Sequence, residues 1–259
     1  MRILYCGDAG VETGIALSAL SVRKHNPGEL EVFILTAGQP IGSGFGIKLE
    51  KALGSGSRVR IFNLEQVFFA DPPTANMDTR FTPFCMLRLY ADLVPEITGR
   101  VLYLDADVMC RGSLSPLYDT DLTEAEIAGV PDRYGKWFFG NVLCHTYLNS
   151  GVLLMDMEKI RESGLFGKCR IMCQEKKMFM PDQSALNKLA KRKKLPRRWN
   201  EQAAIRPDTV CKHFTTFFRF FPRFRAVTIK PWQAEAMHTQ LGITEFDPIL
   251  EDYQRSFES

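Results

Sequence analysis

The first third of the chain alternates short apolar runs with apolar segments of helical period, and this alternation constrains the fold more than any other feature. The runs Arg2–Cys6, Glu31–Leu35 and Val59–Phe62 are rich in Ile, Leu, Val and Phe, which is typical of strands. The segments Ile15–Val22 and Ile47–Leu53 carry apolar residues at helical spacing. Strands that alternate with helices in this way predict a parallel sheet of the Rossmann type, which binds nucleotides.

A second set of predicted elements follows this first third. Phe81–Leu93 carries apolar residues on one helical face and predicts a helix, and the run Val101–Leu104 predicts a strand. Further along, the pattern predicts one strand and two helices, at Tyr147–Met157, Phe166–Lys177 and Gln183–Lys193. The pattern becomes irregular after Pro196. Because no internal repeat or long linker divides the chain, we expect one α/β domain over residues 1–232, followed by an acidic tail or helix over residues 233–259.

The composition excludes several classes of protein. With 45% hydrophobic and 24% charged residues, the 259-residue chain is neither disordered nor fibrous. No stretch of about 18 residues is continuously apolar, which argues against a membrane-spanning helix. The N-terminus reaches the acidic Asp8 early and lacks the apolar core and cleavage site of a signal peptide. We therefore expect a cytoplasmic protein.

The seven cysteines lack the paired Cys-x-x-Cys spacing that zinc and redox sites need. Cys169 and Cys173 lie four residues apart, as two residues on one face of a helix do. In a cytoplasmic protein such cysteines serve as small apolar side chains. We expect all of them to be free thiols.

Charge is distributed unevenly along the chain. Residues 186–230 hold thirteen Lys and Arg against two acidic residues, whereas residues 231–259 hold one Arg against six. Residues 217–225 alternate aromatic and basic side chains, which suits a membrane interface, where each cation gains about 1 kcal/mol from anionic lipid. This predicts peripheral contact with the inner face of the cell membrane through residues 186–230, and the alternative is a buried aromatic hairpin with solvated arginines. A nucleic-acid-binding module would explain only this segment, so we expect no nucleic-acid partner.

Two carboxylates follow directly after the predicted strand Val101–Leu104. Asp105 and Asp107 would lie at the carboxyl end of that strand, where open α/β sheets bind ligands. If the chain turns there, both can coordinate Mg²⁺ or Mn²⁺ and leave positions for phosphate oxygens. The spacing alone fits two solvated acidic residues equally well.

The residues around this pair form a set that points to one family. The set consists of Asp8, Arg88, Val101–Val108, Ser113–Asp119, Leu148–Met155, Pro181–Asn187, Lys212–Phe214 and Lys230–Trp232. In this order they resemble glycosyltransferase family 8, the retaining enzymes that include bacterial lipopolysaccharide galactosyl- and glucosyltransferases and glycogenin. The resemblance covers residues 1–232. It implies a GT-A type fold, a Rossmann-like mixed sheet flanked by helices, here with a basic and aromatic C-terminal extension from about residue 190.

The resemblance also implies a metal site. Asp105 and Asp107 match the two aspartate ligands, Ala106 between them is expected to contact the donor, and His213 matches the histidine that completes the site. Neutral imidazole is a good ligand for Mn²⁺ and a poor one for Mg²⁺, so we expect Mn²⁺, with Mg²⁺ as the alternative. Without the resemblance, a single histidine between Lys and Phe would be interpreted as structural.

A UDP-hexose donor is implied by further matches. Asp8 matches the position that contacts uridine, and Arg88 and Lys230 match the cations that pair with the diphosphate. Asn149 and Gly151 match a strand that lines the donor-sugar pocket. Structural interpretations remain open: a helix N-cap for Asp8, a surface ion pair for Arg88, and a strand-start turn for Asn149 and Gly151.

Asp182 and Gln183 match the family's Asp-Gln pair near the anomeric carbon. Asp182 is expected to bind sugar hydroxyls and Gln183 to lie on the β face of the sugar, although both also fit a simple helix cap. The implied reaction moves galactose or glucose, with retention, to an acceptor hydroxyl on a lipid-linked or surface glycan. Because no other carboxylate matches a nucleophile, we favour front-face attack, in which the departing phosphate accepts the acceptor's proton. Asp182 is the alternative nucleophile.

The chain departs from the bacterial galactosyltransferases at one point: residues 214–229 separate His213 from Lys230, where those enzymes have only a few residues. Two other activities share parts of this pattern. Haloacid-dehalogenase phosphatases also place two aspartates after a strand, but usually near the N-terminus. A glycogenin-like self-glucosylating primer needs a long C-terminal tail with an acceptor tyrosine, and none is evident.

Overall fold

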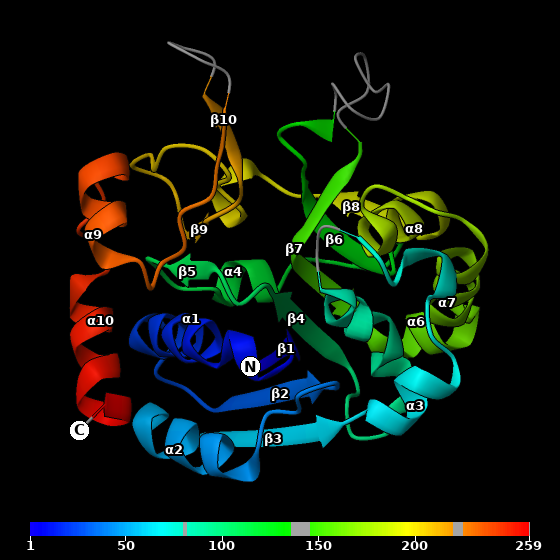
Figure 1. The fold of residues 1–259 in the computed structure, drawn as a ribbon, viewed down its shortest axis with the longest axis horizontal. Helices are drawn as coiled ribbons and strands as arrows, with labels where there is room; N and C mark the ends of the chain where they lie inside the picture. Colours follow the sequence, from blue (N-terminus) through cyan, green and yellow to red (C-terminus); the bar gives the residue numbers. More distant parts are fainter. Residues whose placement is uncertain (80–81, 136–145, 220–224, 259) are drawn as a thin grey trace.

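The computed structural model describes residues 1–79, 82–135, 146–219 and 225–258 (Figure 1). Its helices and strands are, in chain order, β1 (Arg2–Gly7), η1 (Ala9–Val11), α1 (Glu12–His25), β2 (Leu30–Thr36), α2 (Ser43–Leu53), β3 (Ser57–Asn63), α3 (Glu65–Ala70), η2 (Thr74–Asn76), η3 (Pro83–Leu93), β4 (Arg100–Leu104), β5 (Val108–Cys110), α4 (Ser115–Tyr118), β6 (Ile127–Pro131), β7 (Leu148–Asp156), α6 (Met157–Ser163), α7 (Leu165–Glu175), α8 (Pro181–Leu189), β8 (Arg192–Lys194), η4 (Arg197–Trp199), β9 (Cys211–His213), β10 (Phe217–Arg219), β11 (Arg225–Val227), α9 (Ala234–Ala236), η5 (Met237–Leu241), α10 (Asp247–Tyr253) and η6 (Gln254–Glu258). The η elements are 3-10 helices, except that η5 and η6 are π-helices. The three strands and two helices predicted for the first third are all present.

The main sheet of the described residues has seven strands in the order β3-β2-β1-β4-β7-β6-β8. Strands β1 to β4 pair in parallel, β7 runs antiparallel to both β4 and β6, and β8 is parallel to β6. The register places Ile3 of β1 beside Val32 of β2 and Leu102 of β4. The expected mixed α/β sheet is therefore confirmed.

Each face of the sheet packs against its own layer of helices, because alternate residues of a strand point to opposite faces. Ile3 and Tyr5 of β1 belong to the core shared with α1, α2 and α10, whereas Leu4 and Cys6 belong to the core shared with η3 and α7. Figure 1 shows α1, α2 and α10 gathered away from α6 and α7, with the sheet between them. Strands buried on both faces carry apolar residues throughout, which is why they were visible in the sequence.

The helix predicted over Gln183–Lys193 is partly wrong. Helix α8 ends at Leu189, and Arg192–Lys194 form strand β8, in which Arg192 lies beside Ile127 of β6. Arg and Lys have good helix propensity, so the local sequence favours a helix here. The strand forms because it pairs with β6, which is distant in the sequence. The helix predicted from Phe81 is the 3-10 helix η3, and Phe81 itself lies outside the described residues.

The irregular segment after Pro196 contains short elements that complete the fold. Strand β9 pairs with β5 in a small second sheet, and β10 pairs with β11 in a hairpin. Residues 220–224, most of the aromatic and basic stretch predicted to contact a membrane, lie outside the described residues. None of the described helices combines the length and the apolar character needed to span a membrane.

Residues 233–259, predicted as an acidic tail or helix, contain α9, η5, α10 and η6. Helix α10 lies against α1 (Figure 1), and Met237, Phe246 and Ile249 are buried in the core that α1 shares. The division into 1–232 and 233–259 stays a prediction.

The six described cysteines are free thiols, and Cys144 lies outside the described residues. Cys169 and Cys173 are both buried on α7, in the core beneath η3. They face the same core, as their spacing predicts.

Candidate active site

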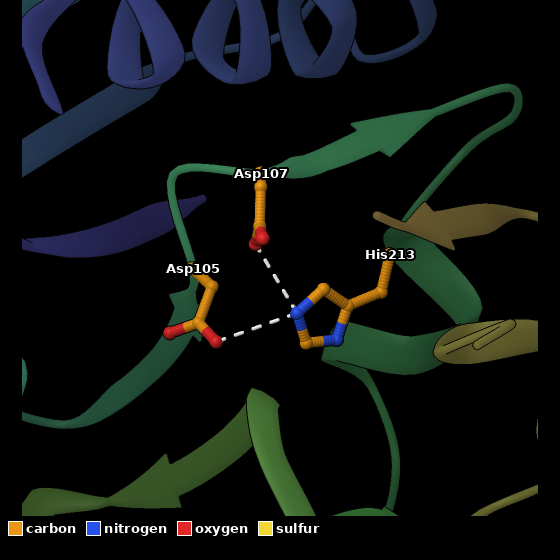
Figure 2. Close-up of side chains that lie close together, drawn as sticks. All are labelled: Asp105, Asp107 and His213. Carbon is orange, nitrogen blue, oxygen red and sulfur yellow. Dashed lines mark ion pairs between the residues drawn. The ribbon is translucent and has the colours of Figure 1, made fainter. Parts of the chain in front are cut away.

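Strand β4 ends in a tight turn that carries the two predicted carboxylates. The backbone N–H of Asp105 donates to the carbonyl oxygen of Gly151 on β7 at 2.8 Å, and the N–H of Val108 donates to the carbonyl oxygen of Asp105 at 3.0 Å. Figure 2 shows Asp105 and Asp107 pointing toward the same space beyond the end of β4. The turn that the metal hypothesis requires is therefore present.

His213 reaches these carboxylates because β9 pairs with β5. His213 lies opposite Val108 in that pairing, and the N–H of Phe214 donates to the carbonyl oxygen of Asp107 at 3.0 Å. The Nε2 atom of His213 lies 3.1 Å from Oδ1 of Asp107 and 3.5 Å from Oδ2 of Asp105 (Figure 2). Three residues from two distant parts of the chain thus converge.

Asp105, Asp107 and His213 form a donor set that fits a divalent cation. One ligand atom from each lies within 4.8 Å of the others. Carboxylate oxygens and an imidazole nitrogen suit Mn²⁺ better than Mg²⁺. Gly151 provides the space for the ring, because a Cβ atom there would lie 2.6 Å from Nδ1 of His213 and 2.8 Å from Oδ2 of Asp105. The glycine predicted to admit the donor sugar therefore admits the histidine ring.

Lys230 joins this cluster from beyond the inserted segment. Its Nζ atom pairs with Oδ2 of Asp107. Strands β10 and β11 lie between His213 and Lys230 in the sequence. Because they pair antiparallel, the chain runs out along β10 and back along β11, which brings Lys230 near His213 again. Residues 214–229, which set this sequence apart from the galactosyltransferases, therefore do not keep Lys230 away from the metal cluster.

Two carboxyl groups of the site have pKa values shifted in opposite directions. Burial by itself would raise the pKa of Asp107, but His213 and Lys230 outweigh it and hold that pKa well below its usual range. Asp107 is thus ionised at neutral pH, as a metal ligand must be. Burial raises the pKa of Asp182, and the nearby Arg88 only partly offsets this.

Arg88 is buried beneath the site and is not part of a surface ion pair. Its side chain is 3% exposed, and Nη2 donates to Oδ1 of Asp105 at 3.0 Å while Nε lies 3.2 Å from Oδ2 of Asp182. Nη1 donates to the carbonyl oxygen of Ser150 at 2.6 Å. The guanidinium also lies 3.9 Å from the ring centre of Tyr103. Arg88 therefore links one predicted metal ligand to one predicted sugar-binding carboxylate.

Gln183 is the centre of a buried polar network beside the start of β7. Its Oε1 accepts from the N–H of Ser150 at 2.9 Å and from Nδ2 of Asn149 at 3.3 Å. Its Nε2 donates to Oδ2 of Asp132 at 3.2 Å, and Nδ2 of Asn149 donates to the same oxygen at 2.9 Å. The two predicted amides are thus held in fixed orientations.

Most of the predicted site residues line a single cavity of about 480 Å³. They are Arg88, Asp105, Ala106, Asp107, Asn149, Asp182, Gln183, His213 and Lys230. Asp8 and Gly151 do not line it. Asp8 caps η1 by accepting from the N–H of Gly10 at 3.0 Å, although Val11 of the same short helix does line the cavity. A more open groove between α2 and β3 contains none of the predicted site residues.

Sequence reasoning missed several polar residues of the site, among them Asp132 and Asn200. Asp132 lines the cavity and directly follows β6, just as Asp105 follows β4, so an acidic residue after the apolar run Ile127–Val130 was the available signal. Asn200 is fully buried and accepts a hydrogen bond from Nδ1 of His213 at 3.1 Å. It lies in the irregular segment after Pro196, where no pattern marks it.

Comparison with known proteins agrees with this geometry. A model of the family described as Glycosyl transferase family 8 matches residues 2–235. The chain is 25% identical over 256 residues to lipopolysaccharide 1,2-glucosyltransferase of Escherichia coli K12, which covers 92% of this chain and 74% of that protein. It is also 36% identical over 77 residues to lipopolysaccharide 1,3-galactosyltransferase of Salmonella typhimurium. That match covers 27% of this chain and 23% of that protein.

The fold is similar to that of a solved glycosyltransferase. The crystal structure of galactosyltransferase LgtC in complex with donor and acceptor sugar analogues matches with a TM-score of 0.71 at 21% identity, and covers 97% of this chain and 95% of that chain. This likeness confirms the expected GT-A fold. Because the family model spans nearly the whole sequence, the chain belongs to glycosyltransferase family 8.

Proposed function

We propose that this protein transfers a hexose, galactose or glucose, from a UDP-sugar to an acceptor hydroxyl with retention of anomeric configuration. The observation that carries the proposal is a single cavity lined by four carboxylates, an imidazole, an arginine, a lysine and a set of buried amides. A nucleotide diphosphate needs cations, and a sugar needs fixed hydrogen-bonding groups, so this lining suits a nucleotide sugar. The lipopolysaccharide glycosyltransferases among its relatives support the same reaction class.

Asp105, Asp107 and His213 would hold a divalent cation, and the imidazole ligand favours Mn²⁺ over Mg²⁺. The cation would supply Lewis-acid stabilisation of charge on the diphosphate. The ligand side chains are ready for this role, because neighbouring cations hold the pKa of Asp107 below its usual range.

Lys230 and Arg88 provide positive charge on the two sides of the aspartate pair. As the bond between the sugar and the diphosphate breaks, negative charge accumulates on the leaving UDP, and fixed cations lower that barrier. Ala106 lies between the two aspartates and lines the cavity, where its backbone would face the diphosphate. Asp8, at the N-cap of η1, would accept hydrogen bonds from uridine at the edge of the cavity.

The donor sugar would bind beside Asn149, Asp182 and Gln183, with Gly151 keeping His213 and the sugar-binding strand in close contact. Asp182 would bind sugar hydroxyls. Gln183, which is 1% exposed and held by its contacts to Ser150 and Asn149, would stand on the β face of the sugar and stabilise the positive charge at the anomeric carbon.

We favour attack from the face that UDP leaves. The anomeric carbon–oxygen bond to the phosphate breaks, the acceptor oxygen bonds to the same carbon on the same face, and the acceptor's proton passes to the departing phosphate. No strong base is then required. Asp182 is the alternative nucleophile, but its pairing with Arg88 and its burial favour a binding role.

The acceptor would be a lipid-linked or surface glycan at the inner face of the cell membrane. The exposed basic side chains in 186–230 support this assignment; they include Lys188, Lys191, Arg192, Lys194 and Arg198. Sedimentation with vesicles that contain anionic lipid tests membrane contact directly. Failure to sediment with such vesicles at low salt contradicts it.

A screen of UDP-sugars for slow Mn²⁺-dependent hydrolysis tests the proposed reaction. We expect UDP release from UDP-galactose or UDP-glucose, and a loss of at least about 100-fold in Asp107→Ala, since a metal site supplies several kcal/mol. Asp121→Ala is the matched control, because that acidic side chain is 69% exposed and interacts only with a neighbouring lysine and threonine among the described residues.

Three further measurements separate the alternatives. Hydrolysis of a generic aryl phosphate without use of UDP-sugars would favour the phosphatase. A hexose on a tyrosine or serine of the protein, found by mass spectrometry, would favour a self-glucosylating primer. A hexose trapped on Asp182 would favour a covalent intermediate over front-face attack.

A further inference from the structure

Asn200 lies between the histidine of the metal cluster and the amide of the sugar-binding strand. It is fully buried, and its side chain contacts both His213 and Asn149. We propose that Asn200 is a positioning residue: it accepts a hydrogen bond from Nδ1–H of His213 and so keeps Nε2 as the ring nitrogen that binds the metal beside Asp105 and Asp107. This inference rests on the proposed function and assigns a residue that supports its metal site.

The hydrogen-bond roles can be fixed by starting from groups that have only one role. The backbone N–H of Gly151 can only donate, and it donates to Oδ1 of Asn149 at 3.0 Å. A carboxylate oxygen can only accept, and Oδ2 of Asp132 accepts from Nδ2 of Asn149 at 2.9 Å. The orientation of the Asn149 amide is therefore determined.

The orientation of Asn200 follows from that of Asn149. Nδ2 of Asn200 lies 2.8 Å from Oδ1 of Asn149 and donates to it. A flipped amide would bring two acceptor oxygens to this distance, which costs a buried hydrogen bond and adds repulsion. Oδ1 of Asn200 must then face His213.

The orientation of Asn200 in turn determines which ring nitrogen of His213 donates to it. Nδ1 lies 3.1 Å from Oδ1 of Asn200, an atom that can only accept, so Nδ1 carries a proton. Nε2 is the ring atom that faces Asp105 and Asp107, at 3.5 and 3.1 Å. A metal-binding histidine needs this arrangement: one ring nitrogen donates to a supporting group while the other binds the metal.

The backbone around Asn200 keeps it in place. The N–H of Asn200 donates to the carbonyl oxygen of Arg197 at 2.9 Å at the end of η4. The next residue, Glu201, accepts from the N–H of His213 at 3.0 Å and donates to the carbonyl oxygen of Cys211 at 2.8 Å. Asn200 and His213 are thus carried by backbone segments that are hydrogen-bonded to each other.

Metal affinity and the metal's ligands test the inference without reference to turnover. Mn²⁺ binding is measured by the electron paramagnetic resonance signal of the free ion, and coordination by the imidazole is detected as ¹⁴N modulation of the bound Mn²⁺. In Asn200→Leu we expect affinity to fall about 10- to 100-fold and the ¹⁴N modulation to weaken, because loss of a supporting partner has effects of this size. Asn200→Asp loses the hydrogen bond to Asn149 but keeps an acceptor for Nδ1, as in carboxylate–histidine–metal triads, and should bind Mn²⁺ within about threefold of the wild type.

Asn76→Leu is the matched control. Asn76 is another fully buried amide that bonds to backbone groups, at Cys173 and Lys176, and it does not line the cavity. This substitution should lower stability while Mn²⁺ affinity stays unchanged. A drop confined to Asn200→Leu then reports on the site and not on stability in general.

The results separate this inference from the proposed function. Wild-type affinity and ¹⁴N modulation in Asn200→Leu would overturn the positioning role alone. If Asn200→Leu fails to fold, Asn200→Asp decides, and a loss of more than about tenfold in Mn²⁺ affinity there would overturn the role. A wild-type protein that binds neither Mn²⁺ nor Mg²⁺ would overturn both the metal site of the proposed function and this inference.

Discussion

Because Gly151 has no Cβ atom, the ring of His213 has room to lie beside Asp105. A Cβ atom at that position would lie 2.6 Å from Nδ1 of His213, closer than a Cβ atom approaches a non-bonded atom. We predict that Gly151→Ala displaces the ring, lowers Mn²⁺ affinity at least about tenfold and lowers the free energy of unfolding by about 1–3 kcal/mol. Mn²⁺ titration and urea unfolding measure the two effects.

Gly112→Ala provides the matched control for this substitution. A Cβ atom there would lie 3.6 Å from Val210, which is ordinary van der Waals contact. Both measured quantities should stay near their wild-type values. Unchanged Mn²⁺ affinity in Gly151→Ala would show that His213 is not a ligand in the position described.

The cysteines make a prediction about reactivity and pH. Burial raises the pKa of Cys173 to about 12, and Asp182 adds to the effect. Only the thiolate reacts with iodoacetamide, and at pH 8 a thiol with this pKa is ionised to about one part in ten thousand. We therefore predict that Cys173 stays unmodified in the native protein at pH 8 and reacts in urea, as measured by mass spectrometry. Rapid labelling of the folded protein would contradict the buried environment of α7.

Whether a single strand could be predicted from the sequence depended on what stabilises it. β1, β2 and β4 were predicted because burial on both faces requires a continuous apolar run, and that run is local in the sequence. β8 and β9 were missed, because three-residue strands of Arg, Lys, His and Cys have no local pattern and depend on pairing with β6 and β5.

The site residues divide in the same way. Asp105 and Asp107 were identified beside a predictable strand, but His213 and Lys230 were assigned only through the family resemblance. Their approach to Asp107 depends on β9 and on the hairpin of β10 and β11, which are non-local pairings. Asn200 was missed for the same reason, since its function lies in what it contacts.

The junction of α8 and β7 yields a prediction at this scale. Oδ1 of Asn187 accepts from the N–H of Leu148 at 2.6 Å, and its Nδ2 donates to the carbonyl oxygen of the same residue at 2.7 Å. Asn187→Leu leaves both backbone groups of a buried residue without these partners. We predict a loss of about 2–4 kcal/mol in the free energy of unfolding, measured in urea. Lys188→Ala, on the exposed face of the same helix, should change it by less than about 0.5 kcal/mol.

For the molecule as a whole, the charge pattern of the sequence overestimates the number of unpaired basic side chains on the surface. Within 186–230, Lys212 is buried against backbone carbonyl oxygens, Lys230 pairs with Asp107, and Arg197 pairs with Glu201 and Asp208. A count of charges cannot reveal these internal pairs, because it does not show which side chains meet: Asp107 lies far away in the sequence, and both acidic residues within 186–230 pair with the same arginine. The predicted membrane contact must therefore depend on the basic side chains that remain exposed.

The last segment of the chain provides a test of how the whole molecule unfolds. Phe246 is 2% exposed, and its ring centre lies 5.9 Å from that of Phe214, the neighbour of His213. If residues 233–259 are part of the same cooperative unit as the catalytic core, Phe246→Ala should lower the free energy of unfolding by about 3–5 kcal/mol in a single transition seen by both fluorescence and circular dichroism. Phe257→Ala, where the ring is only half-buried, should cost much less. Two separate transitions, or an unchanged free energy in Phe246→Ala, would instead favour an independent C-terminal segment and the division predicted at residue 232.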